Sequence, residues 1–455
     1  MKTFAQQVHR FSVSDLSMLL IFLFAYACAV LEMAAVGICL LSLLVTLYCL
    51  CHDDIVPMIL PLLLMYGLSF LCPASVWLAW LGIPCGGALV FCMVKNLRGI
   101  RLGRTFPALV ATSLAVLLGG LGSITAEEYF APGALFNVLG LSLIVVAFYL
   151  FLRGSLTRPR DYDVADYVSR SMYVCALFIA FLLLRVFLMH PEELANLDKL
   201  IERMEYYMGW RNGASILLIL CLPFIFYYAR KHGPLHLLSA LFVCLMGVLS
   251  GSRAFIVGGA MIMVLGILYY AYRRPLLRGV ICSLLVASAV LLFCYRGPVL
   301  AFVDRVLCFH YSADYHNEVR YKLFVRAFED LRHTPIFGRG LGYIGNDDLY
   351  PLLDVTAEAA RWRVHWYHSL IPQVVGSFGT VGILAYGYLL VLRLREFFTV
   401  RRTAFAGMLM IAYFAALAYS MFDPGIFSPF PFAILHVMVA TLIEVQPRRE
   451  KSVRK

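Results

Sequence analysis

The sequence has 455 residues, of which 62% are hydrophobic and only 14% are charged, and its mean hydropathy is +0.82. Soluble globular proteins are about half apolar and about a quarter charged, so this composition excludes an ordinary soluble domain. The net charge of +11 comes mainly from basic residues clustered in short connections, which is the positive-inside pattern of membrane proteins and argues against a nucleic-acid partner.

Apolar runs follow one another along most of the chain, and most have roughly the 20 residues that a helix needs to cross a bilayer. They are predicted at residues 16–32, 33–51, 55–72, 74–94, 105–124, 133–152, 168–189, 212–228, 235–250, 254–272, 279–295, 369–392, 403–421 and 426–444. The predicted fold class is all-α, a polytopic transmembrane helical bundle of about fourteen spans. An even span count with basic loops on alternate connections places both termini in the cytoplasm, and the first run is predicted to be a retained helix.

The longest polar stretch, residues 296–368, is predicted to be a loop domain outside the membrane. Within it, residues 317–346 predict an amphipathic helix that is broken at Pro335 and followed by a glycine-rich turn. The expected apolar side consists of Val319, Leu323, Ala327 and Leu331, with the charges elsewhere. The expected domains are an N-terminal transmembrane bundle (1–190), helices carrying two arginine motifs (191–295), the long loop (296–368), and C-terminal helices with a basic cytoplasmic tail (369–455).

Two arginines on the outer face are the first candidate site residues. Arg211, followed by Asn212, stands at the predicted start of a helix, where free N–H groups and the helix dipole favour an anion. Arg253 follows Ser252 in a tight connection whose backbone donors form a plausible cradle for phosphate oxygens. The alternative interpretation of Arg211 is a snorkelling side chain that anchors the helix end.

The loop and its end supply the remaining candidates. Arg320 either assists in anion binding or forms an ion pair within the loop. His365 and His368 are three residues apart, but two histidines without nearby acidic or thiol ligands make a weak zinc site. A single histidine at the membrane face is better suited to general-base work on a sugar hydroxyl, and a packing role is its alternative.

These motifs, in this order, resemble the O-antigen ligase and O-antigen polymerase superfamily of envelope polysaccharide assembly. The resemblance rests on an outer arginine at a helix start, SGSR opening a helix, the PIFGRGLG turn, and HSL with Gly379 and Gly382 downstream. It covers about residues 206–390, and Ser369 stands where the family motif usually has Asn.

The resemblance implies a GT-C-like fold and a glycosyltransferase, ligase or polymerase, in a bacterial plasma (inner) membrane. It would transfer a glycan from a polyprenyl-diphosphate carrier to a hydroxyl on a glycan or lipid-glycan acceptor, with inversion and without a metal or cofactor. Arg211, Arg253 and Arg320 would then bind the diphosphate and His368 would be the catalytic base. Asn212, Ser252, Ser369 and His365 would support them.

Two other classes remain open at this point. A transporter or flippase of a lipid-linked oligosaccharide or another anionic lipid would place cations through its helix centres, where Arg170 and Arg185 are the main candidates. A structural scaffold would need none of the candidate residues individually. The sequence does not distinguish a ligase from a polymerase.

Overall fold

The computed structural model describes residues 2–52, 54–71, 86–88, 90–92, 94–95, 102–125, 137–191, 211–272, 313–341, 367–400, 403–423 and 430–448, with isolated positions between 279 and 297. These residues are overwhelmingly helical, and their β-type pairing is an isolated bridge between Val400 and Arg448.

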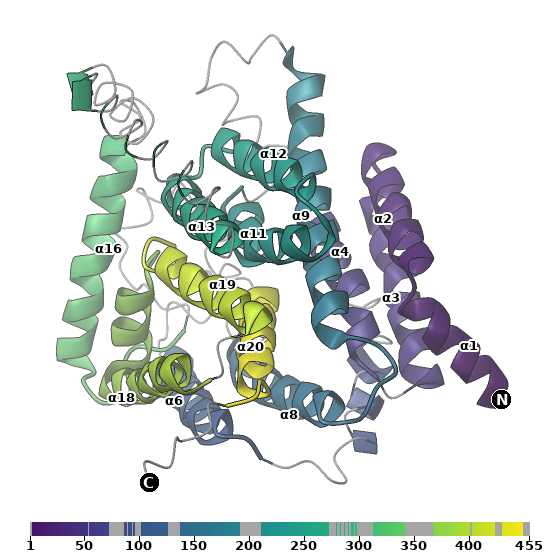
Figure 1. Ribbon diagram of the computed structural model, residues 1–455. Coiled ribbons are helices and arrows are strands. Elements are labelled where there is room, and N and C mark those ends of the chain that lie inside the picture. The colour runs from purple at the N-terminus through teal and green to yellow at the C-terminus, as the bar shows by residue number, and fades with distance from the viewer. Residues whose placement is uncertain are drawn as a thin grey trace, which may run out of the picture. The chain divides into compact units, whose positions relative to one another are not determined.

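The elements shown in Figure 1 are α1 (Lys2–Ser12), α2 (Asp15–Val30), α3 (Ala34–Cys51), η1 (Val56–Met58), α4 (Ile59–Ser69), α6 (Thr105–Thr125), η2 (Gly140–Ile144), α8 (Val145–Leu156), α9 (Val164–Met189), α11 (Arg211–His232), α12 (His236–Leu249), α13 (Arg253–Ala271), α16 (Ala313–His333), α18 (Leu370–Thr399), α19 (Ala404–Ser420) and α20 (Phe430–Glu444).

Many of these helices are apolar enough to lie in a membrane. Among the described residues, six are also long enough to cross it, or seven if the bent pair α1 and α2 forms one span. Shorter apolar helices include α12, α19 and the later part of α20. The expectation of a helical membrane protein is therefore confirmed, whereas the count of fourteen spans and the extracytoplasmic loop domain stay predictions. The predicted run at 74–94 and the one at 279–295 lie largely outside the described residues.

The chain divides into two compact units. Unit 1 comprises Met1–Arg101, Leu150–Val286 and Arg402–Ala415. In it, α9 packs against α11, α4 and α12 (Figure 1). Helix α9 begins where it does because the Asp163 carboxylate accepts hydrogen bonds from the backbone N–H groups of Ala165 and Asp166, which caps the first turn.

Arg170 and Arg185, the two cations that a transporter would use, both have acidic partners in unit 1. Arg170 contacts Asp166 one turn earlier at 3.0 Å and also pairs with Asp15. Arg185 contacts Glu32 at 3.2 Å. Paired charges of this kind are expected at low dielectric, so these arginines have a structural explanation that requires no transport pathway.

Unit 2 comprises Leu102–Tyr149, Ala287–Arg401 and Ala416–Lys455. Its central element is α18, which packs against α6 and α16. The helical conformation of α18 breaks at Gly379, with φ of 59° and ψ of −151°, so the predicted single run at 369–392 is in fact two helical segments.

Two sequence expectations about charge in unit 2 were wrong. The basic residues were expected in short connections, and Arg393 was counted among them, but α18 continues past it. Its buried guanidinium pairs with Glu396 and donates to Thr105 Oγ1 at 2.5 Å. The amphipathic loop helix is confirmed as α16, with Leu323 and Ala327 fully buried, but Asp330 is fully buried beside them. The charges of α16 therefore do not all lie on its outer side.

Candidate functional site

His368 lies at the start of α18 with an unusual backbone. Its φ is 52°, in the left-handed region that residues with a β-carbon seldom adopt. Its side chain is partly exposed, whereas Tyr367 before it and Leu370 after Ser369 are buried. The residue predicted as the catalytic base is thus held in a strained conformation between two anchored neighbours.

Both neighbours of His368 are fixed by hydrogen bonds. The Tyr367 backbone N–H donates to Gln373 Oε1 at 3.0 Å, and its hydroxyl donates to Asp330 Oδ2 at 2.6 Å. The Ser369 hydroxyl donates to the carbonyl oxygen of Met421 at 2.8 Å. Ser369 therefore anchors the chain to the segment after α19, and its bond supports the backbone of His368.

Asp330 ties the loop helix to this anchor. Its Oδ1 lies 3.3 Å from Arg326 Nε and 3.4 Å from Arg339 Nε. Burial raises the pKa of Asp330 above the usual range, while the Tyr367 hydroxyl and the two guanidinium groups act in the opposite direction. The contacts from Tyr367, Arg326 and Arg339 therefore offset only part of the cost of burying this carboxylate.

The glycine-rich turn after α16 closes onto the break in α18. The N–H of Arg339 donates to the carbonyl of Gly376 at 2.8 Å, and the N–H of Gly340 to the carbonyl of Ser377 at 3.0 Å. In return, the N–H of Thr380 donates to the carbonyl of Pro335 at 2.9 Å. Backbone groups that a continuous helix would have paired internally are thus satisfied by the turn.

Two glycines make this close approach feasible. Gly338 and Gly379 both have positive φ, 70° and 59°. A β-carbon on Gly338 would lie 2.5 Å from the carbonyl carbon of Ser377, and one on Gly379 would lie 2.7 Å from the backbone nitrogen of Gly338. Because the obstructing atoms are backbone, neither position can accept a larger residue without displacing the turn.

The arginines predicted to bind diphosphate are placed only by their backbones. Arg211 is the first residue of α11 and Arg253 the first of α13, both in unit 1, whereas Arg320 lies within α16 in unit 2. Asn212 follows Arg211 in α11, and Ser252 caps α13 by accepting a hydrogen bond from the N–H of Phe255 at 3.4 Å.

The predicted diphosphate site is otherwise untested. The side chains of Arg211, Arg253 and Arg320 lie outside the described residues, as does all of His365. The convergence of these arginines with His368 therefore stays a prediction.

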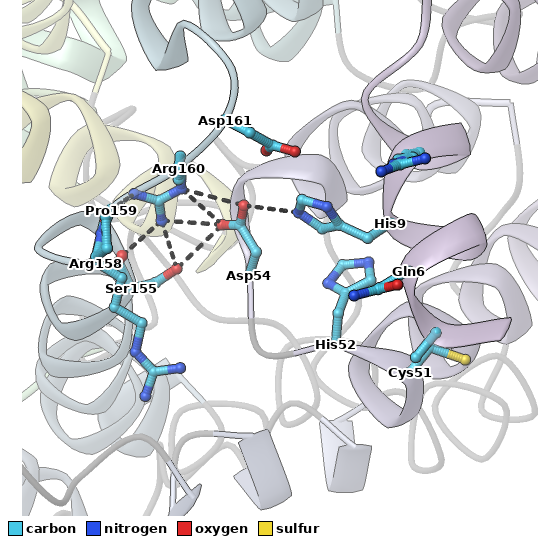
Figure 2. Close-up of a pocket in the computed structure, with 12 residues that line it drawn as sticks. Gln6, His9, Cys51, His52, Asp54, Ser155, Arg158, Pro159, Arg160 and Asp161 are labelled. Carbon is cyan, nitrogen blue, oxygen red and sulfur yellow. Dashed lines mark hydrogen bonds and ion pairs between the residues drawn. The ribbon is translucent and has the colours of Figure 1, made fainter. Parts of the chain in front are cut away.

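A second polar cluster, which the sequence interpretation did not single out, lies in unit 1. Asp54 stands between Arg160 and His9, and His52 lies beside His9 (Figure 2). Arg160 donates from Nε to both carboxylate oxygens at 3.2 and 3.1 Å, and the Tyr162 hydroxyl donates to Oδ2 at 2.5 Å. His9 Nε2 lies 3.4 Å from the same oxygen.

The charge of Asp54 is well compensated. Burial opposes its ionisation, but hydrogen bonds from His9, Arg160 and Tyr162, together with the Arg160 charge, hold its pKa well below the usual range. Arg160 also donates to the carbonyl of Ser155 at 2.6 Å. The cluster forms part of a pocket of about 660 Å³. Arg160 is one of the basic residues in short connections that the sequence interpretation used only to assign the topology.

Metal binding has no support among the described residues, which contain no group of three or more His, Cys, Asp or Glu side chains arranged to hold an ion. No protein-family model and no curated protein matches this chain.

Proposed function

We propose that this protein is a membrane glycosyltransferase, a ligase or polymerase, that moves a glycan from a polyprenyl-diphosphate carrier to a hydroxyl acceptor outside the cytoplasm. His368 is its general base in this proposal, and Arg211, Arg253 and Arg320 bind the diphosphate. The basic loops favour cytoplasmic termini, and the resemblance described above suggests a bacterial plasma membrane as the setting.

The observation that carries the proposal is the backbone of His368. A left-handed conformation costs a non-glycine residue roughly 1–2 kcal/mol, and such strain persists only where the surroundings impose it, most often at functional sites. Here the surroundings are the hydrogen bonds of Tyr367 and Ser369 on either side.

The chemistry requires a base held in one place. The imidazole of His368 accepts the proton of the acceptor hydroxyl while that oxygen forms a bond to the anomeric carbon of the donor sugar. The bond from that carbon to the diphosphate oxygen breaks, and its electron pair stays on the diphosphate, whose charge the arginines stabilise. Attack opposite the leaving group inverts the anomeric centre.

The shell around His368 suits that requirement. Tyr367 is 2% exposed and Asp330 is fully buried, so their hydrogen bond at 2.6 Å is shielded from water. This bond connects the loop helix α16 to the residues just before α18. We assign Tyr367 and Asp330 as positioning residues for the base, because fixed supporting contacts are what keep a catalytic group in productive geometry.

The test is glycan transfer by the purified full chain in nanodiscs, with a polyprenyl-diphosphate oligosaccharide donor, candidate acceptors, and EDTA. Asn adopts the left-handed region more readily than most residues, so His368→Asn removes the base without adding strain. We expect this variant to bind donor normally but to lose about 10²–10⁴-fold in transfer rate.

The matched control is His333→Ala, which removes an exposed histidine from the last turn of α16 in the same unit. It should transfer at the wild-type rate. Transfer by His368→Asn at the wild-type rate would rule out the general-base role, and failure of the wild type with every acceptor class would count against the transferase itself.

A further inference from the structure

Helix α16 has a second apolar side, which is exposed. Four large side chains share one helix face at the i, i+3, i+4 and i+7 spacing, and they form what we call the outer stripe: Tyr321, Phe324, Val325 and Phe328. Each is between 37% and 69% exposed. The rings of Phe324 and Phe328 lie with their centroids 5.0 Å apart. The outer stripe is nearly opposite the buried side formed by Leu323 and Ala327, so packing within unit 2 leaves it uncovered.

The position of α16 beside α18 indicates what the outer stripe meets. Helix α16 packs against α18 (Figure 1), and α18 is long and apolar enough to cross a bilayer. The bond from the Tyr367 hydroxyl to Asp330 fixes the end of α16 three residues before α18 begins at Leu370. This end of α16 therefore lies at the height where the span begins. Its outer stripe is turned toward whatever surrounds that span.

The turn after α16 continues this exposed apolar surface alongside α18. The turn donates hydrogen bonds to the carbonyls of Gly376 and Ser377, roughly 10 Å along the helix from its start at Leu370. On the same turn, Ile336 and Phe337 are 58% and 44% exposed. Large apolar side chains exposed beside the interior of a span are suited to hydrocarbon and disfavoured in water.

The charges near the outer stripe fit the surface of a bilayer. Lys322 and Arg332 are exposed, and Arg332 lies one turn beyond Phe328 on the same line of the helix. Glu329, the one exposed acidic residue within 321–333, lies 3.9 Å from Arg326. Helices that lie in a membrane interface combine an aromatic side with Lys and Arg, whose long side chains reach the headgroups.

We propose that the outer stripe, together with Ile336 and Phe337, is a lipid-contacting surface that seats α16 at the boundary between headgroups and acyl chains. This proposal does not depend on the glycosyl transfer proposed above. Because Asp330 joins α16 to Tyr367, seating α16 in lipid would fix the height of His368 relative to the bilayer. A lipid-linked substrate of any kind presents its polar group at that surface.

The test is photo-crosslinking of the purified full chain in nanodiscs made from a single phospholipid. The photoreactive residue p-benzoylphenylalanine replaces Phe324 or Phe328, and mass spectrometry identifies what its excited ketone captures. We expect adducts with the mass of the phospholipid at both positions. The matched control carries the same residue in place of His333, which is exposed in the last turn of α16 but lies off the outer stripe, and should lose most of the lipid adduct.

Three outcomes would overturn the proposal. Recovery of the intact ketone at both stripe positions, without lipid adducts, would mean that the stripe faces water. Adducts to a second copy of the chain would reassign the stripe to self-association. Equal yields of lipid adduct at Phe324, Phe328 and His333 would mean that α16 has no distinct lipid-facing side.

Hydrogen exchange of the α16 amides in the same nanodiscs gives an independent measurement. Phe324→Gln/Phe328→Gln retains good helix formers but removes two half-buried apolar side chains from lipid, so exchange should become about tenfold faster. Phe324→Leu/Phe328→Leu keeps both positions apolar and should exchange as the wild type does. Unchanged exchange in the Gln variant would contradict the proposal.

Discussion

Removal of one hydroxyl, by Tyr367→Phe, tests whether the anchor beside His368 stabilises unit 2. The hydroxyl donates to the Asp330 carboxylate at 2.6 Å, and both side chains are at least 98% buried. Hydrogen bonds to charged groups contribute roughly 1.5–3 kcal/mol, and water cannot replace this donor without opening the core. We therefore expect Tyr367→Phe to lower the free energy of unfolding by about 2 kcal/mol.

A double-mutant cycle, with the free energy of unfolding measured in mixed micelles, isolates the contribution of this hydrogen bond. In an Asp330→Asn background the Tyr367 hydroxyl would donate to a neutral oxygen, and charge-assisted hydrogen bonds are about twice as strong as neutral ones. Tyr367→Phe should then cost about half as much as in the wild type. Tyr321→Phe, at a position of α16 that is 69% exposed, is the control and should be neutral. An equal cost of Tyr367→Phe in both backgrounds would refute the assigned contact.

Two other substitutions test the backbone conformation of Gly379 and the ion pair between Arg160 and Asp54. Gly379→Ala should lower the midpoint of thermal unfolding, because φ of 59° disfavours a β-carbon by roughly 1–2 kcal/mol and a backbone atom of the glycine-rich turn would lie 2.7 Å from that carbon. The control Gly387→Ala, where nothing lies within 4 Å of an added β-carbon, should be neutral or stabilising. Equal effects of the two substitutions would disprove the close contact between the turn and α18. Arg160→Gln should destabilise unit 1 by up to about 3–5 kcal/mol at neutral pH, and Arg158→Gln, at an exposed position, should not. Since the pKa of Asp54 is held low, the stability it contributes is present above the unfolded value of about 3.9 and is lost as the pH falls below it, so chemical denaturation should show the Arg160→Gln deficit shrinking below about pH 4. A deficit that does not vary with pH would contradict the pairing.

Features that depend on a few neighbouring residues could be predicted well from the sequence. The start of α11 at Arg211 and of α13 at Arg253 agree with the polar residues that precede each apolar run, and Ser252 is the N-cap of α13. The loop helix α16 ends at His333, two residues before Pro335, as a helix preceding proline does. Hydrophobicity, capping residues and proline act over a few residues, so one sequence suffices to find them.

Features that depend on a partner far along the chain could not be predicted. The periodicity that marked Leu323 and Ala327 also brings Asp330 to the buried side. Of the three groups that compensate its charge, Arg326 is one turn away, but Tyr367 and Arg339 become neighbours only in the fold. Likewise, the break at Gly379 becomes visible only once the turn at Gly338 lies against it. A single apolar run carries no signal for such an interruption.

For the same reason, the polar cluster around Asp54 in unit 1 could not be predicted. Asp54 and Arg160 lie 106 residues apart, and the sequence interpretation treated Arg160 only as one of the basic residues in a short connection and did not consider Asp54. Their pairing is a property of the fold, as is the pocket that the N-terminal helix completes with them.

The crossing of the glycine-rich turn and α18 also bears on how this protein can diversify. Leu341 is fully buried at the end of the turn, and Tyr367 is fixed to Asp330, so the described chain is anchored at both of these points in unit 2. Segment 342–366 connects them. Since loop closure depends only weakly on loop length, insertions or exchanges within this segment would leave His368 where it is. For the proposed transferase, the acceptor range could then evolve in segment 342–366 while the catalytic base is inherited unchanged.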